Sequence, residues 1–201
     1  MSDYTSTWSK VTGNTIEVAD FTTELNAIAT ASATKQDIDA TKVTNNASVA
    51  TTSGTAVTIS SAIPTWASMI FITLDGVSLN SSDDIIMQLG DSGGFENSGY
   101  QNYGAIHTDG SSTKFLYVSG ISVSFNGTAG DSHTGIVRLI RHSNTGNEWI
   151  YDVNVGDSNG SGFYYTVAGS KTTDAATDRI QITTDGGSAT FDAGSVSIKW
   201  M

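Results

Sequence analysis

The sequence predicts a mainly β protein, an antiparallel β-sandwich of the jelly-roll-like kind, preceded by one N-terminal α-helix. Apolar and polar residues alternate with period two in several runs of residues 55–201, which is what half-buried antiparallel strands require. Asn-Gly and Asp-Gly pairs lie between these runs, and they supply the positive φ angles that hairpin turns need. A single stretch near the N-terminus, Asp20–Asp39, has the helical period instead.

The predicted helix begins at Asp20, a residue type that can cap the first turn. Its apolar stripe consists of Phe21, Leu25 and Ile28, spaced by four and three residues. A lone helix of this length is marginally stable in water, so the stripe must pack on a partner. That partner is either the chain's own β-region or another molecule, a further copy or a host protein. We assign residues 1–40 to an N-terminal anchoring segment.

Residues 41–54 are rich in Thr, Ser, Asn and Ala and show no periodicity, so we interpret them as a linker. Residues 55–201 form the predicted β-sandwich domain. Met69–Leu74 is apolar on both faces and is expected to be a central or interface strand. Further alternating runs are found at Ile85–Leu89, Ile121–Phe125, Trp149–Val155, Ile180–Ile182 and Val196–Trp200.

Composition argues against several classes of function. Twenty acidic residues stand against 9 basic ones, a net charge of −11, so nucleic acid and anionic membranes would be repelled. There is no cysteine for disulfides or thiolate metal sites. The start of the chain lacks the pattern of a signal peptide, and no apolar run reaches membrane length. We therefore expect no membrane insertion, and a chain that stays in the cytosol or leaves it within a larger assembly.

No group of residues predicts catalysis, a cofactor or a metal. Gly90–Gly94 matches the G-x-S-x-G pattern of hydrolases without the helix that must follow, so we interpret it as a glycine-rich turn. Asp157–Gly162 resembles half of a calcium loop without its final glutamate, and we interpret it as a polar turn. Carboxylates that could serve glycoside hydrolysis mostly lie in turns, where Asp supports the backbone: Asp83, Asp84, Asp91, Glu96 and Asp192. The histidines lack metal spacing and are expected at the surface or an interface: His107, His133 and His142.

Exposed aromatic rings beside amides and hydroxyls can bind sugars, and two segments offer them. Tyr100 and Tyr103 are predicted in a loop, next to Gln and Asn residues. Tyr164 and Tyr165 follow a turn of Gly and Ser. These four tyrosines are the candidate glycan contacts, and a position in the core or at an interface is the alternative for each.

Several short motifs follow one another through the β-region: Ile63–Ala67, Asp75–Ser78, Gln88–Gly94, Ser98–Tyr100, Asp178–Thr184 and Phe191–Ser195. As a group they resemble a C-terminal β-domain found on fibre, appendage and other structural proteins of tailed bacteriophages. The segment Phe21–Lys35 is also similar to the virion-anchoring starts of phage fibres. Within the motifs, Arg179 is placed for a salt bridge inside the domain, and Gly93, Gly94 and Gly194 suit bulges or positive φ.

The resemblance implies a non-enzymatic virion protein, assembled in the host cytoplasm, displayed on the virion surface and usually a homotrimer. We therefore expect a short fibre or appendage that docks on other virion proteins through its N-terminal segment and attaches to host-surface glycan. The chain lacks the long shaft of full tail fibres, so a capsid decoration protein with no receptor role is the alternative. A polysaccharide-degrading tail enzyme is the third class.

Overall fold

The computed structural model divides the chain into two compact units, Met1–Val43 and Thr44–Met201, and each is described by itself. It describes the following residues: 22–32, 44–108, 110–115, 118–125, 127–143, 146–157 and 162–201. Within these ranges, no helix combines the length and the hydropathy of a membrane span.

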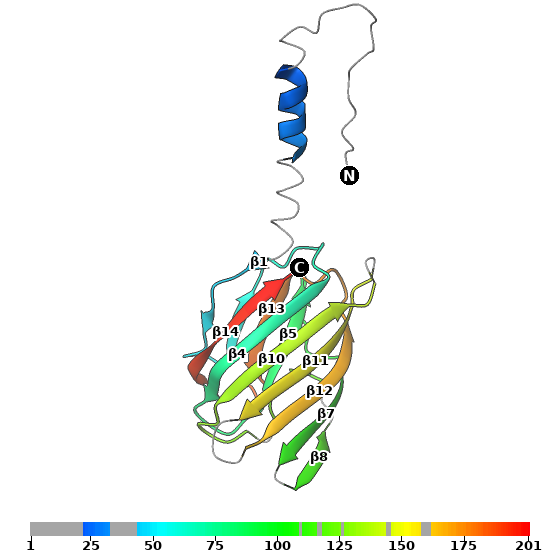
Figure 1. The fold of residues 1–201 in the computed structure, drawn as a ribbon. Helices are drawn as coiled ribbons and strands as arrows, with labels where there is room; N and C mark the ends of the chain where they lie inside the picture. Colours follow the sequence, from blue (N-terminus) through cyan, green and yellow to red (C-terminus); the bar gives the residue numbers. More distant parts are fainter. Residues whose placement is uncertain are drawn as a thin grey trace, which may run out of the picture. The chain divides into compact units, whose positions relative to one another are not determined.

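In the first unit, residues 22–32 form an α-helix (Figure 1). The predicted helix is confirmed over these residues, whereas Phe21 and residues 33–39 lie outside the described part of the chain. Leu25 and Ile28 are 49% and 48% exposed. Within this unit Leu25 and Ile28 are thus about half exposed, and a lone helix of this length needs a packing partner to be stable.

The second unit consists of two antiparallel sheets with a hydrophobic core between them (Figure 1). Its strands are β1 (Thr44–Asn45), β2 (Val49–Ala50), β3 (Ala56–Ser60), β4 (Met69–Leu79), β5 (Ile85–Asp91), β6 (Gly94–Phe95), β7 (Gln101–Thr108), β8 (Ser111–Phe115), β9 (Ile121–Ser122), β10 (His133–Arg141), β11 (Glu148–Asp157), β12 (Tyr164–Thr172), β13 (Arg179–Thr184) and β14 (Phe191–Trp200). The large sheet has the order β1-β14-β4-β10-β11-β12-β7-β8, and β2 also pairs with β14. The small sheet has the order β3-β13-β5-β6, and β9 also pairs with β5.

The predicted fold class is confirmed: a mainly β, antiparallel sandwich preceded by one helix. Consecutive strands often change layer, because β4 belongs to the large sheet, β5 to the small one, β7 to the large one and β9 to the small one. β10, β11 and β12 then follow as a meander in the large sheet. Met69–Leu74 is part of β4, which lies between β14 and β10, so the prediction of a central strand is also confirmed.

The core is built from the inward-facing side chains of both sheets. On β11, Trp149, Tyr151, Val153 and Val155 are all at most 2% exposed, and the residues between them point outward, as the alternation predicts. Each large apolar side chain buried in this way stabilises the fold by roughly 1.5–3 kcal/mol. Burial of the core is therefore the main stabilisation of the sandwich.

Glycine is required where β14 passes β4. The register of this pair shifts twice, between Phe191 and Ala193 and between Ala193 and Ser195. Gly194 has a φ of 91°, and a Cβ at this position would lie 2.4 Å from the Gly76 carbonyl oxygen. The prediction for this residue is confirmed, because a side chain would meet both backbone strain and a clash.

The predicted linker at residues 41–54 is wrong from Thr44 onward. β1 and β2 both pair with β14, and Thr51 is 0% exposed. The Thr51 N–H donates to the Gly194 carbonyl at 3.0 Å, and its hydroxyl donates to the Ala193 carbonyl at 2.8 Å. Strands of two residues are too short to show a period in the sequence, which is why this segment looked like a linker.

A chain that begins at Thr52 should be less stable than one that begins at Thr44, because it lacks β1, β2 and the contacts of Thr51. Losing several hydrogen bonds at about 0.5–1.5 kcal/mol each should lower the thermal midpoint by roughly 5–15 °C, at about 2–4 °C per kcal/mol. Thermal unfolding followed by circular dichroism measures the difference. Equal midpoints would restore the interpretation as a linker.

Candidate functional site

The outer faces of the two sheets differ in what they expose. In the small sheet, every residue of β5 is buried. Gln88, on the outer side of β5, donates to the Ser119 carbonyl and accepts from Gln181. In the large sheet, the outward residues of β10, β11, β12 and β7 are exposed or half-buried. The outer face of the large sheet is therefore the candidate binding surface.

Cross-strand register aligns the outward residues of this face in rows. One row consists of Phe71, Arg138, Asp152, Ala168 and Tyr103. The next consists of Thr73, Ile136, Asn154, Thr166 and Ala105. A further row contains Gly156, Tyr164 and His107. Neighbouring rows are two residues apart on each strand, which is about 7 Å.

Two of the predicted sugar contacts lie on this face. Tyr103 is 67% exposed and Tyr164 is 43% exposed. Tyr103 lies opposite Ala168, four residues along β12 from Tyr164, which separates the two residues by about 13 Å along the strands. His107 lies beside Tyr164, with 6.0 Å between their ring centroids, and its Nε2 is 3.0 Å from Thr166 Oγ1. Two exposed rings thus flank small side chains at the spacing of a short oligosaccharide.

A chain of polar contacts leads across three strands to one of these rings. Arg138 Nε is 2.7 Å from Asp152 Oδ1. The Asn154 amide donates to Asp152 at 3.3 Å and accepts from the Tyr164 hydroxyl at 2.7 Å. These contacts orient donors and acceptors toward solvent before any ligand arrives.

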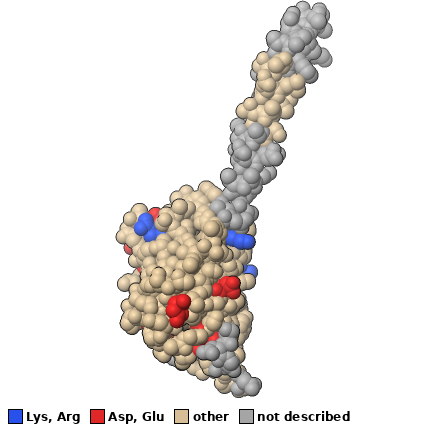
Figure 2. Space-filling model, turned by 90° about the vertical axis from the view of Figure 1, so that its left-hand side faces the viewer, with Lys and Arg blue, Asp and Glu red and all other residues tan. Residues whose placement is uncertain are grey.

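Charge is sparse on the sandwich. Charged residues make up 14% of the whole chain. On the side shown in Figure 2, Lys, Arg, Asp and Glu are few and scattered, and most of the surface is uncharged. Such a surface suits a ligand without charge better than a polyanion.

The other two predicted sugar contacts, Tyr100 and Tyr165, are wrong. Tyr165 is 0% exposed, because neighbouring residues of a strand point to opposite faces and Tyr164 faces solvent. Tyr100 is 1% exposed, and its hydroxyl accepts from the Leu89 N–H at 2.8 Å and donates to the Glu96 carbonyl at 3.0 Å. Burial raises the pKa of both hydroxyls. Neither side chain can contact a ligand at the surface.

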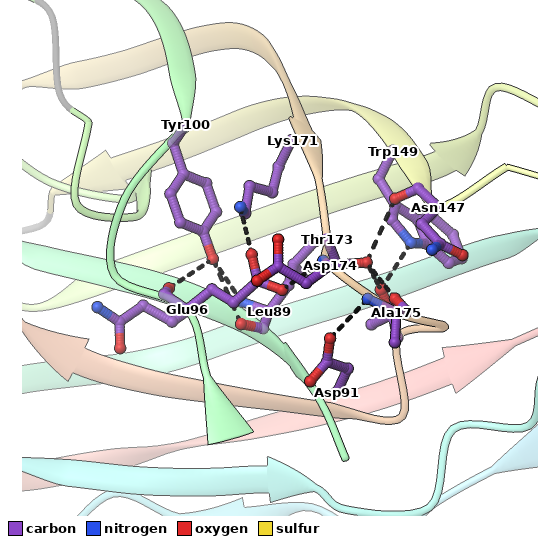
Figure 3. A network of polar contacts seen from close by, with 12 residues as sticks. Leu89, Asp91, Glu96, Tyr100, Asn147, Trp149, Lys171, Thr173, Asp174 and Ala175 are labelled. Carbon is purple, nitrogen blue, oxygen red and sulfur yellow. Dashed lines mark hydrogen bonds and ion pairs between the residues drawn. The ribbon is translucent and has the colours of Figure 1, made fainter. Parts of the chain in front are cut away.

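A buried polar network joins the segment after β5 to the β12–β13 loop (Figure 3). Lys171 is 5% exposed and pairs with the Glu96 carboxylate. The other carboxylate oxygen of Glu96 accepts from the Asp174 N–H at 2.8 Å. Asp91 accepts from the Ala175 N–H at 2.7 Å. Two carboxylates considered for glycoside hydrolysis, Asp91 and Glu96, therefore hold a loop in place.

Other carboxylates from the sequence also support the backbone or neighbouring side chains. Gly90–Gly94 contains the end of β5, the turn at Ser92 and Gly93 and the start of β6, so its interpretation as a turn is confirmed at its centre. Asp83 accepts from the Asp84 N–H at 2.8 Å, and Asp192 accepts from the Ser78 hydroxyl. These are the roles that Asp commonly has in turns and strand ends.

Metal ligands do not gather in the part of the chain that the structure describes: no three His, Asp or Glu side chains there could hold an ion. Residues 158–161 of the predicted polar turn lie outside the described residues. His107 and His142 are exposed as predicted. His133 is 2% exposed, with Nδ1 3.2 Å from the Val77 carbonyl oxygen. The surface prediction is wrong for His133 because it occupies an inward-facing position of β10.

Sequence reasoning missed three isoleucines on the outer face. Ile136, Ile140 and Ile150 are 50%, 42% and 44% exposed. The signal was present, because Ile150 shares its predicted face with Asp152 and Asn154 and is apolar where those two are polar.

No protein-family model, curated protein or solved structure matches the chain. The resemblance to phage structural proteins therefore stays a prediction.

Lys171→Met should destabilise the protein by about 3–5 kcal/mol, because it leaves the Glu96 carboxylate buried without its cation. The matched control, Arg138→Met, breaks an ion pair whose side chains are 48% and 34% exposed, and should lower stability by less than about 1 kcal/mol. Urea denaturation of both variants gives the comparison. Equally small losses would mean that the buried pair does not hold the loops.

Proposed function

We propose that the chain is a structural protein of a bacteriophage virion that anchors through its N-terminal segment and binds host-surface glycan with its β-sandwich. The glycan part rests on one observation: the exposed rings of Tyr103 and Tyr164 lie beside the hydrogen-bonded side chains of Asp152 and Asn154. Sugar rings offer apolar faces that stack on aromatic side chains, and hydroxyls that bond to carboxylates and amides. The low share of charged residues in the chain, 14%, supports a neutral ligand.

The virion part rests on the ordered sequence motifs and on the helix. Among the motif residues, Gly90–Gly94 contains a turn, and Phe191–Ser195 carries the bulges of β14. Positions of this kind maintain a fold, which supports a shared domain and fixes no ligand site. The half-exposed stripe of Leu25 and Ile28, in a unit separate from the sandwich, supports anchoring on another protein.

A capsid decoration protein is the second candidate. The observation that favours it is the exposed isoleucine set of the outer face, Ile136, Ile140 and Ile150, because aliphatic side chains suit contact with protein better than with sugar. Labelling the protein in intact particles and imaging its position would separate a tail location from a capsid location.

Glycan binding should depend on both exposed rings. On a glycan array with the full-length protein, Tyr103→Ala and Tyr164→Ala should each weaken binding by up to about tenfold, since ring contacts contribute about 0.5–1.5 kcal/mol. Trp66→Ala is the control, because Trp66 is 50% exposed and lies outside the large sheet.

Two results of this array experiment, and a separate assay for the release of reducing sugar, lead to different conclusions. A wild-type protein that binds no glycan would favour the decoration protein. Equal losses for all three variants would show that the rings of the outer face have no special part. Release of reducing sugar from a bound polysaccharide would indicate an enzyme.

Anchoring should be lost when Phe21, Leu25 and Ile28 are all changed to Ser. The stripe would lose roughly 1.5–3 kcal/mol of burial per side chain, so particles grown with the variant should lack the protein. The melting transition of the sandwich should not change, because Leu25 and Ile28 are not part of its core. Particle immunoblots and thermal unfolding measure the two effects. Normal incorporation would place the anchor in the β-sandwich.

A further inference from the structure

The exposed isoleucines belong to a larger apolar patch on the outer face of the large sheet. Ile140 on β10 lies opposite Met69 on β4 and opposite Ile150 on β11. Phe71 lies beside Met69 on the same face of β4, and both are half-buried. Ile136 completes the set on β10. These five residues are called the isoleucine patch.

Aliphatic side chains are out of place at these positions. Other outward residues of the same strands include Thr73, Thr134, Asp152 and Asn154, as expected for a solvated face. Exposed apolar area is unfavourable by about 25 cal/mol per Å², and clustered apolar side chains on a soluble protein mark contact surfaces. The isoleucine patch is therefore expected to be covered in the assembled protein.

Charge indicates what covers it. Residues 44–201 contain more than twice as many acidic as basic residues. Among the described residues, the outer face of the large sheet has nearly equal numbers of the two kinds: Lys114, Arg138 and Lys199 against Asp75, Glu148, Asp152 and Asp192. A second copy of the same acidic body can approach this face without the repulsion that it meets elsewhere.

We propose that two copies of the chain pack their isoleucine patches together around a two-fold axis that runs parallel to the strands, between β10 and β11. Such an axis places each β10 residue opposite its own register partner on β11 of the other copy. Ile140 then contacts Ile150 of the partner copy, and Arg138 contacts Asp152 of the partner copy. The axis thus matches Ile140 with Ile150 and a cation with a carboxylate, which is the self-complementarity of an isologous interface. By the same register Ile136 faces Asn154 of the partner copy.

The orientation of this axis has a consequence for the N-terminal segments. Thr44, where the second unit begins, pairs with Trp200 at one end of the large sheet. An axis parallel to the strands keeps both copies pointing the same way, so the two Thr44 residues lie at the same end. Both anchoring segments then leave together. This suits the proposed function, but the pair itself is argued from register and charge alone.

The pair brings the partner copy over the part of the face that carries the exposed tyrosines. Tyr164 lies opposite Gly156, six residues along β11 from Ile150, a distance of about 20 Å. Tyr103 is on β7, two strands beyond Asp152 on β11. Two sheets of the same twist that are related by an axis parallel to the strands stay face to face beyond β10 and β11. Pairing and glycan binding are therefore expected to compete.

Sedimentation of the full-length chain tests the pair. The parent carries Phe21→Ser, Leu25→Ser and Ile28→Ser, so that it cannot associate through the helix. One chain has a mass of 21.0 kDa. At micromolar concentration the parent should sediment with twice that mass. Adding Ile150→Lys should raise the dissociation constant by about 100-fold or more, because it brings an ammonium into an apolar contact. Adding Val118→Lys, at an apolar residue that is 66% exposed outside the large sheet, should change nothing.

A parent that sediments as one chain, or as the three that the sequence predicts, overturns the proposal. An Ile150→Lys variant that stays paired also overturns it. Circular dichroism of each variant shows whether the sandwich remains folded.

An exchange of charge tests the contact between copies directly. In the same parent, Arg138→Asp and Asp152→Arg each place like charges across the axis, so each variant alone should sediment as a single chain. Mixed in equal amounts, they should form a hetero-pair, because the acidic chain then meets the basic one. The ion pair within the chain is broken in both variants, so rescue by mixing can come only from contact between copies. No rescue overturns the proposed register.

The outcome of these sedimentation experiments can be distinguished from the outcome of the glycan-array experiment. Tyr103→Ala should pair as the parent does, and Ile150→Lys, as a single chain, should bind glycan at least as well as the parent. An Ile150→Lys variant that is a single chain and binds no sugar refutes only the proposed glycan function. A parent that binds sugar as a single chain refutes only the pair.

Discussion

The backbone pairing of β4 with β14 on one side and with β10 on the other sets the register of the large sheet. Side chains alternate between the faces, so a slip of one residue would move Ile70, Ile72 and Leu74 out of the core and turn Met69 and Phe71 inward. Core burial thereby enforces one register. The rows of outward residues on β10, β11, β12 and β7 are aligned as a consequence, and both candidate binding surfaces depend on that alignment.

The loops between the sheets depend on a different interaction. Lys171 is on β12 of the large sheet, and Glu96 follows β6 of the small sheet, so their buried ion pair crosses between the layers. The desolvation of both charges is offset by their attraction, by the Asp174 N–H, and by the Tyr100 ring, whose centroid is 5.3 Å from the ammonium. We infer that this network contributes more to fixing one loop arrangement than to net stability.

The fold was predictable because its signals are local, whereas the site depends on which strands become neighbours. Alternation identified the faces of β11, and the position of Arg179 predicted its salt bridge, 2.6 Å long and made to Asp178. Tyr103 and Tyr164 share a face only because β7 pairs with β12, far apart in sequence, and no local pattern reports that pairing. The prediction of Tyr165 as a sugar contact was an avoidable error. Tyr164 and Tyr165 are neighbours on one strand and point to opposite faces, so only one of them can face solvent.

The outer face limits what a ligand can gain, because its polar groups already bond to one another in the free protein. A sugar hydroxyl that binds Asp152 or Asn154 replaces an existing bond, for a net gain of about 0.5–1.5 kcal/mol. Stacking on Tyr103 and Tyr164 adds a similar amount per ring. Binding at a single face should thus be weak. In the proposed pair Asp152 contacts Arg138 of the partner copy, so pairing and sugar binding use the same part of the large sheet. The balance between the two would decide whether this face is a contact between copies or a surface for a neutral ligand.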